Sequence, residues 1–177
     1  GAGPSQMARR MRQALGGNLD RALTIARTES LRAYRQAQIA SYQANRDLIT
    51  EWEWSCSFSR RTCLNCLALD GKLFPIERPM PAHVNCRCST IPRIKALPPL
   101  KRQTGAEWFA AQPDAVQKEM MGPRAFAEYK AGRVSIDDFQ GEKTSPQWGT
   151  MTYQRSLISI QAGTDAPTWT RGTPRTP

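Results

Sequence analysis

The feature that most constrains this chain is a cluster of four cysteines and one histidine within 28 residues. The pair Cys63 and Cys66 has the spacing C-x2-C, and sixteen residues separate it from the group His83, Cys86 and Cys88. Thiolate sulfur and imidazole nitrogen are typical zinc ligands, and a structural zinc ion takes four of them in a tetrahedron. The cluster therefore predicts a structural zinc site that holds this part of the chain together.

Five candidate ligands exceed the four places of such a site, and the sequence leaves the choice open. Cys63 and Cys66 are the safest pair, because two intervening residues let both sulfurs face one ion. Two more ligands must come from His83, Cys86 and Cys88. Cys86 and Cys88 would share one face of an extended segment, whereas His83 and Cys88 have the wider spacing of a knuckle pair. The alternatives to a metal are packed thiols or a disulfide.

Between the two groups, Asp70 and Gly71 stand between apolar residues. Asp-Gly in this setting is a strong signal for a two-residue hairpin turn, because both turn positions favour positive φ. We therefore expect a hairpin that folds the second ligand group onto the first and is stapled by zinc.

Upstream, Asn18 is expected to cap a long helix, since no Gly or Pro occurs from Leu19 to Thr50. One stripe advances by steps of three and four residues, and we expect it to lie against a sheet or another helix. It consists of Leu23, Ala26, Ser30, Ala33, Ala37, Ala40, Ala44 and Leu48. The other side is expected to be a solvated basic face, or one that meets DNA or a partner. It carries Arg21, Arg32, Arg35 and Arg46.

Alternating polar and apolar residues from Glu51 to Phe58 predict a half-buried strand, in which Cys56 is a buried small hydrophobe. A second strand is expected from Cys88 to Ile94. Short helices should follow from Ala106, with a break at Gln112-Pro113. The predicted fold class is α+β, with a long N-terminal helix on a small antiparallel sheet.

The chain is expected to form one domain over residues 1–143 and an extended C-terminal arm over residues 144–177. The arm is rich in Ser, Thr, Gly and Pro and has too few apolar residues for its own core. We expect it to become ordered by docking on a partner protein or a neighbouring copy. The expected anchors are Tyr153, Leu157, Ile158, Ile160 and Trp169.

Composition restricts the class of protein. The net charge of +10 favours attraction to polyanions such as DNA, through a term that is independent of sequence and sensitive to salt. No window approaches a membrane span and no signal peptide opens the chain, so a soluble, non-secreted protein is expected. Motifs for phosphate-binding loops, zinc proteases and serine hydrolases are absent, and the single histidine is needed as a ligand. The sequence therefore predicts no enzyme.

The motif R-T-C-x2-C-x2-L-D-G-K-x-F, followed by P-x-H-x-N-C-R-C, resembles the Mu F-like minor head proteins of tailed phages. The helical segment I-A-R-T-E at residues 25–29 and elements from Trp108 to Val134 are similar to the same family. Ser59 stands where the family commonly has Asp. The resemblance suggests that Arg27-Thr28-Glu29 fixes the long helix to the metal region, where Arg87 would reach Glu29 or the hairpin backbone.

The resemblance implies a structural protein of the virion that is made in the host cytoplasm and built into the capsid interior. Its implied partners are the portal protein and the major capsid protein, with several copies around the portal, and packaged DNA through the basic surface. It would act in head assembly and in DNA packaging or ejection. Two alternatives are the assembly or delivery module of a phage-borne toxin and a zinc-containing, non-specific DNA-binding protein.

Overall fold

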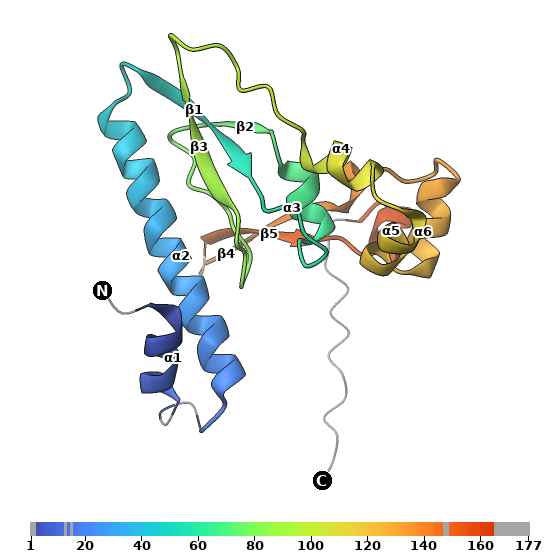
Figure 1. Cartoon of the computed structure of the whole chain (residues 1–177), viewed down its shortest axis with the longest axis horizontal. Helices are drawn as coiled ribbons and strands as arrows, with labels where there is room; N and C mark the ends of the chain where they lie inside the picture. Colours follow the sequence, from blue (N-terminus) through green and yellow to red (C-terminus); the bar gives the residue numbers. More distant parts are fainter. Residues whose placement is uncertain (1–2, 13, 15, 147–148, 165–177) are drawn as a thin grey trace.

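The computed structural model describes residues 3–12, 14, 16–146 and 149–164. Helices and two small antiparallel sheets occur together, which confirms the predicted α+β class (Figure 1). In chain order the elements are α1 (Pro4–Met11), α2 (Leu19–Ala44), β1 (Ile49–Ser55), α3 (Leu64–Leu69), β2 (Leu73–Pro75), β3 (Ser89–Ile94), α4 (Gly105–Ala110), α5 (Asp114–Met121), α6 (Pro123–Lys130), the 3-10 helix η1 (Asp137–Phe139), β4 (Gln140–Ser145), β5 (Gly149–Gln154) and α7 (Leu157–Gln161).

The long helix α2 lies along the first sheet, and α1 folds back beside its N-terminal part (Figure 1). Asn18 caps α2 as predicted, because its side chain accepts a hydrogen bond of 2.9 Å from the Arg21 amide. The buried face differs from the predicted stripe. It consists of Ala22, Ala26, Arg35, Ile39 and Tyr42.

The prediction that the stripe is buried is wrong for its C-terminal half. The residues there are exposed: Ala33, Ala37, Ala40 and Ala44. The side chains of Ile39 and Tyr42 are larger than alanine and bury more apolar area. The face of α2 that carries them therefore packs on the sheet in place of the alanine face. None of the helices in the described parts of the chain is long and apolar enough to cross a membrane.

The first sheet has the strand order β2-β1-β3, with β1 antiparallel to both neighbours. Trp52 and Trp54 of β1 are fully buried, and the Trp52 ring stacks on Phe74 with ring centroids 4.6 Å apart. The Trp52 indole N–H donates to the carbonyls of Pro75 and Arg78. Burial of these rings fixes β1 as the centre of the sheet.

The predicted hairpin at Asp70-Gly71 is wrong, because a helix and not a strand precedes it. Residues 64–69 form α3, and Gly71 (φ 86°) turns the chain from α3 toward β2. All six residues of α3 are buried. A fully buried apolar run shows no periodicity that would distinguish a helix from a strand, so the turn motif alone was misleading.

A buried ion network connects the sheet, α3 and α4. Arg102 Nη1 lies 2.6 Å from Asp70 Oδ2, and Arg102 Nη2 lies 2.7 Å from Glu53 Oε1. The Asp70 side chain has no exposed area and also accepts hydrogen bonds from the amides of Cys56 and Gly105. Arg102 lies in a segment without regular secondary structure, and from there it neutralises two buried carboxylates.

Short helices follow the first sheet as predicted. Thr104 and Glu107 form a capping box at the start of α4, and Pro113 separates α4 from α5. Phe109 of α4 is fully buried in a second apolar core with Leu64 and Leu67 of α3. Helix α3 thus lies between the first sheet and the C-terminal helices.

The predicted extended arm is not extended where the structure describes it. Strand β4 runs across the expected boundary after residue 143 and pairs with β5, and α7 follows. Gln154 Oε1 accepts a hydrogen bond from the Leu64 amide, and Leu157 and Ile160 pack on the second core. Residues 144–146 and 149–164 therefore pack on their own domain in the single chain, and docking of this segment on a partner stays a prediction. Trp169 lies outside the described residues.

Candidate metal centre

All five predicted ligands lie in one cluster. Cys63 is the N-cap residue of α3 and Cys66 belongs to its first turn, whereas His83, Cys86 and Cys88 come from the segment between β2 and β3. The five residues form two overlapping groups, and within each group all ligand atoms lie within 4.8 Å of one another. Cys66 belongs to both groups. They are Cys63, Cys66 and His83, and Cys66, Cys86 and Cys88. The cluster can therefore hold a metal ion.

His83 is oriented for ligation through one nitrogen. Its Nε2 lies 3.1 Å from Cys66 Sγ and 3.3 Å from Cys63 Sγ, while Nδ1 lies 2.8 Å from the carbonyl oxygen of Val84. A carbonyl can only accept, so Nδ1 carries a proton, and Nε2 is the nitrogen that faces the thiols. This outer hydrogen bond selects the tautomer that a metal requires.

The turn between His83 and Cys86 depends on Asn85, which has a φ of 60°. Asn tolerates this left-handed conformation better than most residues. The Asn85 amide donates to Thr28 Oγ1 at 3.0 Å, and its side-chain oxygen accepts from Arg27 Nη1 at 2.8 Å. The predicted link between α2 and the metal region is therefore present at Arg27 and Thr28.

Glu29 does not take part in that link. Its carboxylate pairs with Arg32 at 3.6 Å, one turn along the same helix. The expectation that Arg87 reaches Glu29 is not met by any contact among the described residues, and Arg87 is exposed. A further side chain of α2 binds the backbone of the ligand loop.

That side chain is Arg35, which was assigned to a solvated basic face and is in fact 5% exposed. Its Nη2 donates to the carbonyl oxygens of Cys86 and Cys88 at 2.7 Å each, and its Nε donates to Cys88 at 2.9 Å. Arg35 therefore fixes the backbone of two candidate ligands. Arg35 lies four residues before Ile39 and seven before Tyr42, a spacing that places all three on one helix face. This spacing could have predicted its burial, but arginines are mostly exposed.

Hydrogen bonds within the metal-free cluster shift its protonation. A hydrogen bond from Cys66 lowers the pKa of Cys63 to about 5; burial opposes this, and the neighbouring His83 assists it. Burial alone would lower the pKa of His83, but hydrogen bonds to Cys63 and Cys86 raise it to about 10. Without metal, these shifts favour the thiolate of Cys63 and the protonated form of His83, so a cation that binds Nε2 competes with that proton.

Cys56 stays outside both groups, as predicted. It is partly buried, packs against both apolar cores, and burial raises the pKa of its thiol. A protonated thiol of this kind behaves as a small hydrophobe and not as a ligand.

A family model described as Phage Mu protein F like protein matches residues 1–91. The match includes α2, β1, β2, the start of β3 and all five candidate ligands. This chain belongs to that family. No curated protein and no solved structure matches the chain. Membership of the family indicates a protein of phage head morphogenesis.

Proposed function

We propose that this member of the family is a structural minor head protein of a tailed phage, built into the capsid interior beside the portal. The observation that carries the proposal is that the contacts between α2 and the ligand cluster lie inside the matched region. These contacts fix the ligand loop to α2. In this proposal the portal and the major capsid protein are partners, the protein is not an enzyme, and assembly takes place in the host cytoplasm.

We further propose that the metal is zinc, held by Cys63, Cys66, His83 and Cys86. Metal–ligand distances of about 2.3 Å for sulfur and about 2.05 Å for nitrogen place tetrahedral sulfurs about 3.8 Å apart and sulfur about 3.5 Å from nitrogen. Cys66 Sγ lies 3.9 Å from Cys86 Sγ, and the two sulfur–nitrogen distances are 3.1 and 3.3 Å. These three separations suit one ion. Cys86 shares its group with Cys66 and Cys88, so its sulfur must move toward Cys63 and His83 to complete the set. Cys88 then packs in the first core.

A structural role for this zinc follows from its surroundings. Cys66 and Cys86 are 2% and 3% exposed, and four protein ligands leave no open position for substrate. The single histidine of the sequence is used as a ligand, which leaves no second histidine as a general base.

The ligand set is tested by two matched substitutions. We expect Cys86→Ser to lower the zinc content of purified protein from about one ion per chain to well below half, because serine is a poor zinc ligand. Cys88→Ser is expected to keep the ion. Elemental analysis of both variants is the measurement, with Cys56→Ser as the control. Loss of zinc from the Cys88 variant together with retention in the Cys86 variant would show the ligand set to be wrong.

The assignment to the head is tested in purified phage heads. We expect the protein in mature heads, and we expect it to remain with the portal when the major capsid shell is dissociated. Quantitative mass spectrometry of the intact heads and of the portal fraction measures both. Absence from purified heads would refute the proposal.

The basic surface supports weak binding to packaged DNA. The exposed Arg21 of α2, the partly exposed Arg27 and Arg32, and the net charge of +10 provide attraction without base-reading geometry. We expect affinity for duplex DNA to fall by about tenfold or more between 50 and 200 mM salt and to be equal for unrelated sequences. Fluorescence anisotropy measures this, and affinity that hardly changes with salt would contradict it.

A further inference from the structure

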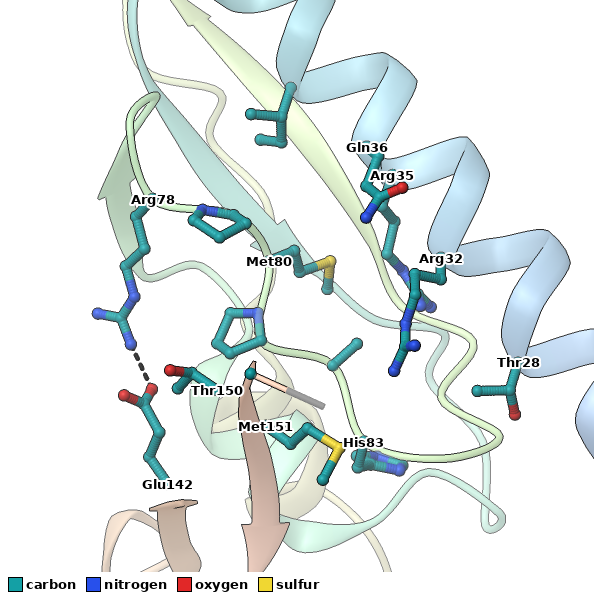
Figure 2. A pocket seen from close by; sticks show the side chains of 15 residues that line it. Thr28, Arg32, Arg35, Gln36, Arg78, Met80, His83, Glu142, Thr150 and Met151 are labelled. Carbon is teal, nitrogen blue, oxygen red and sulfur yellow. Dashed lines mark hydrogen bonds and ion pairs between the residues drawn. The ribbon is translucent and has the colours of Figure 1, made fainter. Parts of the chain in front are cut away.

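A groove of about 330 Å³ lies beside the metal centre, between α2, the segment before His83, and the β4–β5 hairpin (Figure 2). We call it the α2 groove. Its apolar part is formed by Ile39, Met80, Pro81 and Met151. Its polar part includes Arg32, Gln36, Arg78, Glu142 and Thr150. Its size suits a few side chains of a bound segment.

The charged groups of the groove favour an anion. Three arginines line it and only one carboxylate does, that of Glu142, which pairs with Arg78 (Figure 2). Arg35 is committed to the ligand loop, but its charge still acts on the groove. The pairs Arg78–Glu142 and Arg32–Glu29 are both partly exposed, so each is weak and can be exchanged for an incoming carboxylate at small cost.

The apolar part adds a second requirement. Methionine side chains are flexible and polarizable and are common in surfaces that accept peptides of varied shape. Met80 and Met151 face the groove from two different elements. The exposed Gln36 amide has no partner in the described part of the chain, so it is available to a peptide backbone. The occupant should therefore carry both carboxylates and aliphatic side chains.

We propose that the α2 groove binds an acidic, aliphatic peptide segment of a partner protein. The carboxylates of that segment pair with Arg32 and Arg78, and its aliphatic side chains contact Met80 and Met151. The identity of the partner as a head protein rests on the proposed function, whereas the peptide chemistry rests on the groove alone. A DNA backbone fits less well, because it offers phosphate but no aliphatic group for the apolar part.

The segment before His83 forms one wall of the groove, and His83 itself is a lining residue. The binding surface and the candidate metal centre therefore share a structural element. Metal that fixes this segment also fixes the groove wall, which would make peptide binding weaker in metal-free protein.

The six methionines of the chain allow a direct test. Protein labelled with 13C at the methionine methyl groups is titrated with a capped hexapeptide of sequence Asp-Leu-Glu-Asp-Leu-Glu. We expect saturable shifts of the Met80 and Met151 signals only. The remaining methionines, Met7, Met11, Met120 and Met121, lie outside the groove and serve as internal references.

Arg32→Glu is expected to weaken the peptide affinity by about tenfold or more, because an attractive charge pair becomes repulsive. Arg21→Glu is the matched control, since it makes the same change of charge on an exposed part of α2 and should leave the affinity within about twofold. Unchanged reference methyl signals show that each variant is folded.

The proposal is overturned if the acidic peptide does not shift Met80 and Met151, if a Lys-Leu-Lys-Lys-Leu-Lys peptide shifts them equally, or if both charge variants lose affinity to the same degree. Shifts caused only by duplex DNA would also overturn it. These outcomes are independent of whether the protein is found in heads, so failure of the groove proposal does not depend on the proposed function.

Discussion

Removing the proposed zinc ligand Cys66 is expected to unfold the segment from β2 to β3 and to destabilise the whole domain. Cys66 is the one residue shared by both ligand groups, and it lies in α3 between the two apolar cores. The binding energy of a structural zinc site is folding energy, on the order of 10 kcal/mol. Total domain stabilities are about 5–15 kcal/mol, so the loss is comparable to the whole.

Hydrogen exchange is the measurement for Cys66→Ser. We expect loss of amide protection first in residues 76–88, whose turn is built on the ligands, and a lower unfolding temperature. Cys56→Ser is the matched control and should keep both protection and zinc, because Cys56 is outside the ligand groups. Full protection of residues 76–88 in the Cys66 variant would mean that packing alone holds this segment.

The second large effect is expected for Arg102→Met. This substitution keeps an unbranched apolar stem but removes the guanidinium, and it leaves the buried carboxylates of Asp70 and Glu53 without their main counter-charge. Removing one partner of a buried ion pair costs about 3–5 kcal/mol, because the remaining charge is desolvated and uncompensated. We expect a loss of about 3 kcal/mol, since Arg93 still lies 3.5 Å from Glu53.

Urea unfolding at neutral pH measures this loss. The control is Arg60→Met, which removes an exposed pair with Glu119 and should change stability by less than about 1 kcal/mol. Equal effects of the two substitutions would show that the buried network contributes no more than a surface pair.

The sequence predicted the parts of the site that depend on residue type and spacing. Thiols and imidazole at these separations have few uses other than metal binding, which predicts the candidate ligands Cys63, Cys66, His83, Cys86 and Cys88. The structure brings all five together. The link from Arg27 and Thr28 was suggested only by the family resemblance. The link is made by hydrogen bonds to Asn85, which lies in a turn with positive φ. The periodicity of the sequence does not predict such a turn.

Other features depended on competition between patterns. The alanine stripe of α2 and the face containing Arg35, Ile39 and Tyr42 have similar periodicity, and tertiary packing selected the second. The strands β4 and β5 consist largely of Ser, Thr, Gly and charged residues, which carry little hydrophobic alternation. They are ordered by contacts with α3 and with Pro81, whose carbonyl accepts from the Thr152 amide at 2.6 Å. Such long-range contacts cannot be read from a local window.

The central claim is that one zinc ion, bound by three sulfurs and one nitrogen, closes the cluster beneath α2. X-ray absorption at the zinc edge, on protein purified under reducing conditions, tests it most directly. We expect about one zinc per chain, with three sulfur ligands at about 2.3 Å and one nitrogen ligand at about 2.05 Å. A folded, reduced sample without zinc, or a zinc shell made of oxygen ligands, would contradict the claim.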